Sequence, residues 1–173
     1  AVDAYGADSI ELEYRRKISR QKHDAILAML RHTPHVSFVC ETYTREELGD
    51  TDARDITFPN GPDEPYTLYK KRLCSLHQGP VRVSVALERR GEPDGSVKKV
   101  FRIKKRHSFA IDGVWRVDLT RVETNDPRFM DDDEYAYELE LELITASSGL
   151  YTYTIDHLLE WGSMLINDVH DKA

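Results

Sequence analysis

Several segments of this chain alternate apolar and polar residues, and they sort their charged residues by sign. The segment Tyr135–Thr145 carries Glu138, Glu140 and Glu142 at every second position, with apolar residues between them. Successive side chains of a β-strand point to opposite faces, so these three carboxylates share one face, roughly 6.6 Å apart. Like charges this close oppose folding unless a cation lies near them. The pattern therefore restricts the chain to β structure in which an acidic row meets cationic partners.

The same period of two recurs along most of the chain. Glu11 and Glu13 share one face of an early segment, whereas Arg102, Lys104 and Arg106 share one face of a middle segment. Turn-forming residues separate the last four alternating segments, which predicts that these four form an antiparallel meander. The predicted strands are Ser9–Arg15, Val36–Tyr43, Tyr66–Leu73, Val81–Arg90, Val97–Ile111, Val114–Val122 and Tyr135–Thr145.

The remaining segments predict two helices and two loops. Apolar residues at helical spacing predict an amphipathic helix over Lys17–His32 and a second over Ile155–Val169, with Thr154 as its N-cap. The polar, acidic segment Arg45–Pro65 predicts a long surface loop or flap, and Asp131–Glu134 predicts a second acidic loop.

Composition limits the classes of protein to which the chain can belong. Its 173 residues include 24 Lys and Arg against 31 Asp and Glu, which gives a formal net charge of −7. This length suits one domain, typically about 150 residues, so a single domain over residues 1–173 is predicted. Charges interrupt each apolar run well before the ~20 residues that a membrane span needs. The acidic balance argues against a surface that coats nucleic acid, so a polyanion must be bound locally.

Several common site chemistries find no support in the sequence. Cys40 and Cys74 lie far apart without a CxxC motif, which excludes a disulfide framework and a cysteine zinc site and makes a reducing compartment the default. Neither a P-loop nor a dinucleotide-binding glycine motif is present. Trp115 and Trp161 are predicted to be core residues. The strands with sorted charges remain the feature that indicates chemistry.

Those strands allow two interpretations. A solvated face of an antiparallel sheet is the simpler explanation for any one of them. Their joint occurrence argues against it, because a solvated face gains nothing from keeping Glu on the outer strands and Arg and Lys on the middle ones. If the sheet closes with these faces inward, it encloses a tunnel with an acidic and a basic wall, and the helices cover the apolar outside. A polyphosphate together with a divalent cation fits such a tunnel.

The charged segments resemble the triphosphate tunnel metalloenzymes, and most closely their RNA 5′-triphosphatase branch, the mRNA-capping enzyme β subunits of fungi, protozoa and viruses. This resemblance implies a mainly β (α+β) fold, a closed eight-stranded antiparallel β-barrel with flanking helices. It implies hydrolysis of the γ-phosphate of 5′-triphosphorylated RNA as the first step of mRNA capping, and hydrolysis of free nucleoside triphosphates. It rests on the segments Ile10–Glu13, Val83–Glu88, Arg102–Phe109, Arg116–Thr120 and Tyr137–Glu142.

The resemblance also implies roles for individual residues. Glu11, Glu13 and Glu142 match the ligands of a Mg²⁺ or Mn²⁺ cofactor. The implied catalytic carboxylates are Glu88 and Glu140, nearest the attacking water, together with Glu138. Arg15 stands where many relatives have lysine, and its role is left open. The implied phosphate-binding wall is Arg82, Arg102, Lys104, Arg106 and Arg116, with Asp118 and Glu138 holding these cations, and Lys70, Lys71 and Arg72 are secondary candidates.

The partners that follow are the 5′-triphosphate end of nascent RNA, nucleoside triphosphates and an mRNA guanylyltransferase that the sequence does not identify. A capping role implies a nuclear location, and the oligomeric state stays open. Two alternatives compete with this function. One is a tunnel triphosphatase acting on thiamine triphosphate or inorganic polyphosphate. The other is a barrel that binds polyphosphate without cleaving it, although such a barrel has no use for carboxylates that repel its ligand.

Overall fold

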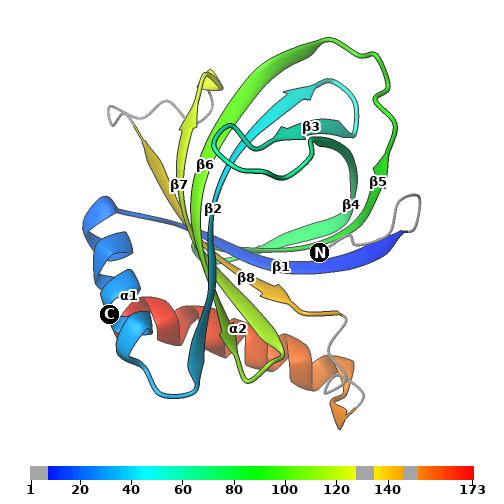
Figure 1. Cartoon of the computed structure of the whole chain (residues 1–173). Coiled ribbons are helices and arrows are strands. Elements are labelled where there is room, and N and C mark those ends of the chain that lie inside the picture. Colours follow the sequence, from blue (N-terminus) through cyan, green and yellow to red (C-terminus); the bar gives the residue numbers. More distant parts are fainter. Residues whose placement is uncertain (1–7, 128–134, 146–151) are drawn as a thin grey trace.

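The computed structural model describes residues 8–127, 135–145 and 152–173. Within them, eight strands form a closed barrel in the order β1-β5-β4-β3-β2-β6-β7-β8, and each neighbouring pair is antiparallel (Figure 1). The predicted closed eight-stranded barrel is therefore confirmed. The elements are β1 Ser9–Ile18, α1 Arg20–His32, β2 Val36–Gly49, β3 Ala53–Thr57, β4 Tyr66–Gln78, β5 Val81–Gly91, β6 Lys98–Ile111, β7 Trp115–Thr124, β8 Ala136–Leu143 and α2 Ile155–Asp171.

The predicted four-stranded meander is only partly correct. Strands β6, β7 and β8 pair in succession, but β5 pairs with β1 and β4 rather than with β6. The residues Glu92–Gly95 connect β5 to β6 without making them neighbours, because β2, β3 and β4 lie between these two strands in the barrel. Local turn residues indicate where a strand ends, whereas barrel closure decides which strand becomes its neighbour.

The predicted loop at Arg45–Pro65 is wrong for its first half. Strand β2 continues through Gly49 and pairs with β6, and β3 follows at Ala53–Thr57. Glu46 faces the charged inside of the barrel. The polar composition of this segment therefore suggests a loop, although the segment forms a strand. The first helix begins at Arg20 rather than Lys17, since β1 runs to Ile18 and Ser19 caps the helix. The second predicted loop, Asp131–Glu134, lies outside the described residues.

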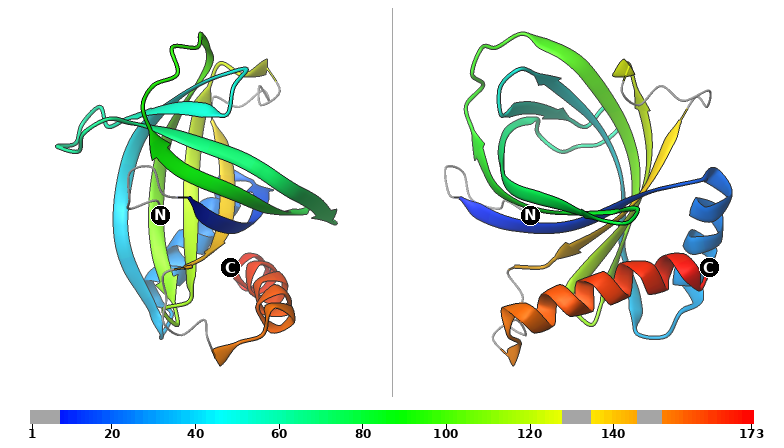
Figure 2. Two further views of the ribbon diagram at one scale, coloured as in Figure 1. Left: turned by 90° about the vertical axis from the view of Figure 1, so that its right-hand side faces the viewer. Right: turned by 180° about the vertical axis from the view of Figure 1, so that it is seen from behind.

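The apolar faces of the strands point out of the barrel and form the core against the two helices. Tyr14, Trp115 and Leu141 on the strands pack with Ile26 of α1 and Ile166 of α2, and these five side chains are at most 1% exposed. Both helices cover the same side of the barrel (Figure 2). Trp115 is a core residue as predicted, whereas Trp161 is only partly buried and packs against this core. No helix among the described residues is long and apolar enough to cross a membrane.

Gly162 lets α2 approach the barrel closely. A Cβ atom at this position would lie 2.5 Å from Tyr14 Cε2 and 2.9 Å from Trp115 Cη2. Because both rings are fully buried, they cannot move aside freely, and overpacking of this kind costs about 1–3 kcal/mol. Gly162→Ala is therefore expected to lower the free energy of unfolding, measured by urea titration, although alanine favours helix. Met164→Ala at an exposed site of α2 is the control, and an unchanged Gly162→Ala midpoint would contradict this packing argument.

Candidate active site inside the barrel

The inner faces of the strands enclose a charged cavity of about 200 Å³. The alternation that sends apolar residues outward sends the acidic row of β8 and the basic row of β6 inward. The interior position that the sequence predicted for these faces is therefore confirmed. The cavity is lined by Glu11, Glu13, Arg15, Thr44, Glu46, Arg54, Ile56, Tyr66, Leu68, Lys70, Glu88, Arg90, Lys104, Arg106, Arg116, Glu140 and Glu142.

The three predicted metal ligands all line this cavity and come from the neighbouring strands β1 and β8. Glu13 lies directly opposite Glu142 in the strand register. Burial and the nearby charge of Glu11 outweigh Arg116 and raise the pKa of Glu142 to about 7. Burial also raises the pKa of Glu11, although Lys70 Nζ donates a hydrogen bond of 2.6 Å to its Oε1. Both carboxylates are therefore harder to ionise in the folded protein than in water.

Each of these carboxylates contacts a cationic side chain. Glu11 contacts Lys70, Glu13 lies 3.1 Å from Arg15 Nε, and Glu142 accepts a hydrogen bond of 2.5 Å from Arg116. Among the described residues, no three acidic, His or Cys side chains surround a common point at metal-binding distances. The predicted ligands thus share one wall of the cavity while their side chains point to separate partners.

Two arginines of the basic wall contact one buried aspartate. Asp118, 1% exposed, accepts a hydrogen bond of 3.1 Å from Arg116 Nε and lies 3.6 Å from Arg106 Nε. Ser108 donates to its other oxygen at 2.6 Å. Burial disfavours the charged guanidinium, but Asp118 and Glu142 outweigh it and raise the pKa of Arg116. Asp118 therefore contacts the cations that the resemblance assigned to it, although it does not itself line the cavity.

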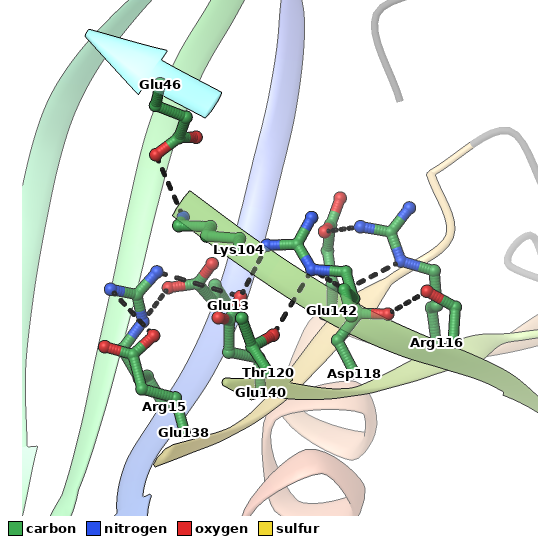
Figure 3. A network of polar contacts seen from close by, with 12 residues as sticks. Glu13, Arg15, Glu46, Lys104, Arg116, Asp118, Thr120, Glu138, Glu140 and Glu142 are labelled. Carbon is green, nitrogen blue, oxygen red and sulfur yellow. Dashed lines mark hydrogen bonds and ion pairs between the residues drawn. The ribbon is translucent and has the colours of Figure 1, made fainter. Parts of the chain in front are cut away.

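Arg15 lies at the centre of an acidic cluster. Its guanidinium lies 3.1 Å from Glu13, 3.7 Å from Glu138 and 3.7 Å from Glu140 (Figure 3). Burial opposes ionisation of Glu140, but Arg15 and Arg106 outweigh it and hold the pKa of Glu140 well below its usual range. Glu138 is also buried but does not line the cavity, and burial raises its pKa. Arg15, whose role the sequence left open, thus links three of the predicted site carboxylates.

Two predicted phosphate ligands lie away from the cavity. Arg82 Nη2 is 3.9 Å from Glu13, and Arg102 Nη2 is 3.7 Å from Asp126. Neither residue lines the cavity, although both belong to inward rows. Their strands continue beyond the cavity, so residues that share a face of a strand need not share a site.

Sequence reasoning missed several lining residues, most of them on β2, β3 and β4. Lys104 Nζ lies 3.0 Å from Glu46, which belongs to the segment predicted as a loop. Extending the alternation of Thr42 and Thr44 by one step would have found Glu46. Lys70, a secondary candidate, lies 3.3 Å from Glu88 and joins this carboxylate to Glu11. The other missed residues are Thr44, Arg54, Ile56, Tyr66, Leu68 and Arg90.

The Glu46–Lys104 pair predicts how the stability of the barrel depends on pH. Burial disfavours the carboxylate, but Lys104 and Arg54 outweigh it and lower the pKa of Glu46 to about 2 from 4.5. A lowered pKa stabilises the fold above the unfolded value, and this contribution is lost as pH falls towards about 2. Glu46→Gln is therefore expected to lose less unfolding free energy than the parent between about pH 5 and pH 2, measured by urea titration. Glu47→Gln, which changes a more exposed neighbour, should behave like the parent. Equal pH dependence of the parent and Glu46→Gln would contradict the pairing.

Comparison with known proteins finds a family model and a relative that resemble this chain. A family model described as "mRNA capping enzyme, beta chain" matches residues 74–151. The 5'RNA triphosphatase A449R of Paramecium bursaria Chlorella virus 1 is 31% identical over 135 residues, which cover 75% of this chain and 66% of that protein. The match thus spans just under two thirds of the viral protein.

Solved structures share the fold. The RNA triphosphatase Pct1 of S. pombe superposes with a TM-score of 0.61 at 13% identity, covering 96% of this chain and 82% of that one. The Mimivirus capping enzyme triphosphatase gives a TM-score of 0.59 at 18% identity, covering 94% and 92%. The chain therefore resembles the mRNA capping enzyme beta chain over residues 74–151 and shares the barrel fold of these two triphosphatase structures.

Proposed function

We propose that this protein is an RNA 5′-triphosphatase of the capping-enzyme type, which removes the γ-phosphate and leaves a 5′-diphosphate end. The observation that carries the proposal is the cavity itself, in which Arg106 and Arg116 face the interior beside the acidic row of β8. A binding protein gains nothing from carboxylates that repel a polyphosphate, whereas hydrolysis uses both signs of charge. The name of the viral relative, a 5'RNA triphosphatase, supports the same activity.

The basic wall is suited to the charge that develops during phosphoryl transfer. Such a reaction leaves a protein mainly the tasks of positioning the substrate and neutralising its oxygens. Arg106 and Arg116 offer planar forks that bind phosphate oxygens in pairs, and Lys104 adds a point charge. Asp118 contacts both arginines, which fixes their direction before the substrate arrives.

The acidic wall fits a divalent cation by the chemistry of its donors. Glu11, Glu13 and Glu142 supply carboxylate oxygens, which Mg²⁺ and Mn²⁺ prefer. Burial, together with the charge of a neighbouring glutamate, raises the pKa values of Glu11 and Glu142, and a bound divalent cation would favour their ionised forms. We propose these three residues as its ligands. When bound, the ion supplies polarisation of the γ-phosphorus and neutralisation of its oxygens.

Glu140 is proposed to orient the attacking water. Its lowered pKa keeps it ionised, so it can accept a hydrogen bond from water but is a weak general base. Glu88 is the alternative acceptor, since it lines the same cavity beside Lys70. Glu138 contacts Arg15 behind this position and is proposed to hold that cation in place.

The proposal is tested by phosphate release from triphosphate-ended RNA with and without Mn²⁺. We expect release with the metal and its loss after chelation. Free nucleoside triphosphates are expected to be hydrolysed as well, and a capping role would place the protein in the nucleus. Thiamine triphosphate and tripolyphosphate serve as competing substrates. Binding of triphosphate-ended RNA without release would support the binding barrel instead, and exclusive cleavage of tripolyphosphate or thiamine triphosphate would support a different tunnel triphosphatase.

A further inference from the structure

A second cavity, of about 480 Å³, adjoins the charged one. It lies where β3 ends, β4 begins and β5 ends. Ile56, Tyr66 and Arg90 line both cavities, so the two lie on either side of these three residues. A substrate whose triphosphate lies in the charged cavity therefore has the second cavity within reach of its nucleoside end.

The second cavity has a different chemistry. Ile56, Pro65, Tyr66 and Pro93 give it apolar and aromatic walls, and only Asp55, Arg90 and Glu92 among its lining residues are charged. Cavities of roughly 300–1,000 Å³ with mostly apolar walls and a few polar groups are typical of sites for small organic ligands. The second cavity is thus suited to an uncharged, flat group rather than to a phosphate.

A stacked pair marks the boundary between the cavities. The Arg90 guanidinium lies 3.9 Å from the centroid of the Tyr66 ring, and the Phe58 ring lies 6.2 Å from the same ring. Arg90 Nε is buried and has no hydrogen-bond partner among the described residues. Planar guanidinium groups and aromatic rings are the surfaces on which unpaired bases stack in RNA-binding proteins.

We infer that the second cavity is a nucleobase subsite, which holds the base of the first nucleotide while its triphosphate extends into the charged cavity. This inference rests on the proposed function and names how the nucleoside end of that substrate is held. Arg90 and Tyr66 stand between the base and the phosphates, so they contact the substrate at its nucleoside. Because every base has a π face, a stacking subsite tolerates all four bases. The subsite therefore distinguishes a nucleotide from a bare polyphosphate without reading the base sequence.

The test compares a substrate that has a base with one that lacks it. In Tyr66→Leu, the kcat/KM for ATP is expected to fall about tenfold more than the kcat/KM for tripolyphosphate, mainly through a higher KM. Tenfold corresponds to about 1.4 kcal/mol, within the ~1–3 kcal/mol of base stacking on an aromatic side chain. Tyr66→Phe keeps the ring and should keep the parental ratio of the two values. The matched control is Tyr43→Leu, which removes a tyrosine of β2 that lines neither cavity.

A second measurement avoids variants altogether. In the parental protein, adenosine β,γ-imidotriphosphate should inhibit tripolyphosphate hydrolysis with a Ki about tenfold lower than imidotriphosphate without a nucleoside. Equal Ki values, or equal losses for both substrates in Tyr66→Leu, would overturn the subsite. A parental protein that hydrolyses neither substrate nor triphosphate-ended RNA would refute the proposed function instead, so the two failures are distinguishable.

Discussion

Replacing Glu11 or Glu142 by alanine is expected to abolish release of the γ-phosphate, with a loss of at least about 10²–10³ in rate, while the barrel stays folded. Removing one preorganised charge-stabilising group from an active site typically costs this much. Both carboxylates line the charged cavity, and we propose them as ligands of the divalent cation. The measurement is phosphate release from triphosphate-ended RNA at saturating Mn²⁺.

Removing the charge of Glu142 should lower activity but raise stability. This difference separates loss of the active site from loss of the fold. Burial and Glu11 raise the pKa of Glu142 to about 7, so the ionised carboxylate is unfavourable in the folded protein at higher pH. Glu142→Gln removes this charge and should raise the melting temperature measured at about pH 8. The matched control is Glu41→Ala, which deletes an exposed glutamate on the outside of β2 and should leave turnover unchanged. Near-normal turnover of Glu11→Ala or Glu142→Ala would show that the metal assignment is wrong.

Replacing Arg116 by alanine is expected to slow γ-phosphate release by about 10²–10³-fold, and lysine should restore only part of the loss. The Arg116 guanidinium donates to Asp118 at 3.1 Å and to Glu142 at 2.5 Å, so its fork is held in one direction. Lysine keeps the positive charge but offers a single flexible ammonium, which cannot reproduce paired contacts to phosphate oxygens. The kcat/KM values of the three proteins should therefore rank arginine above lysine above alanine.

Arg121→Ala provides the matched control for this series. Arg121 lies on the same strand, β7, but outside the cavity, where it stacks over the Tyr135 ring at 4.4 Å. Its loss should leave turnover near the parental value. Full activity of Arg116→Lys would show that paired contacts to phosphate oxygens are not required. Loss of activity in Arg121→Ala would instead point to a general effect of charge.

Much of the cavity lining could be predicted because the alternation along a strand determines which of its residues share a face. Glu138, Glu140 and Glu142 alternate with apolar residues, so their common face follows from local geometry alone. The same reasoning placed Lys104, Arg106 and Arg116 in the interior, and the cavity contains all three. It failed for Glu46, whose strand looks like a loop because polar residues line both its inner face and much of its outer face. It also could not tell Arg106, which lines the cavity, from Arg102, which shares its face and turns to Asp126.

Alternation along the chain thus determined which side of the sheet each charge occupies, because the face of a strand residue depends only on its own position. Pairing of strands far apart in sequence was decided by the closed barrel, because it depends on which edges remain free once the others have joined. That closure places Glu13 of β1 opposite Glu142 of β8 and Lys70 of β4 beside Glu11. It also places the charged cavity beside the apolar one, with Tyr66 and Arg90 lining both. This neighbourhood cannot be predicted from any local sequence pattern.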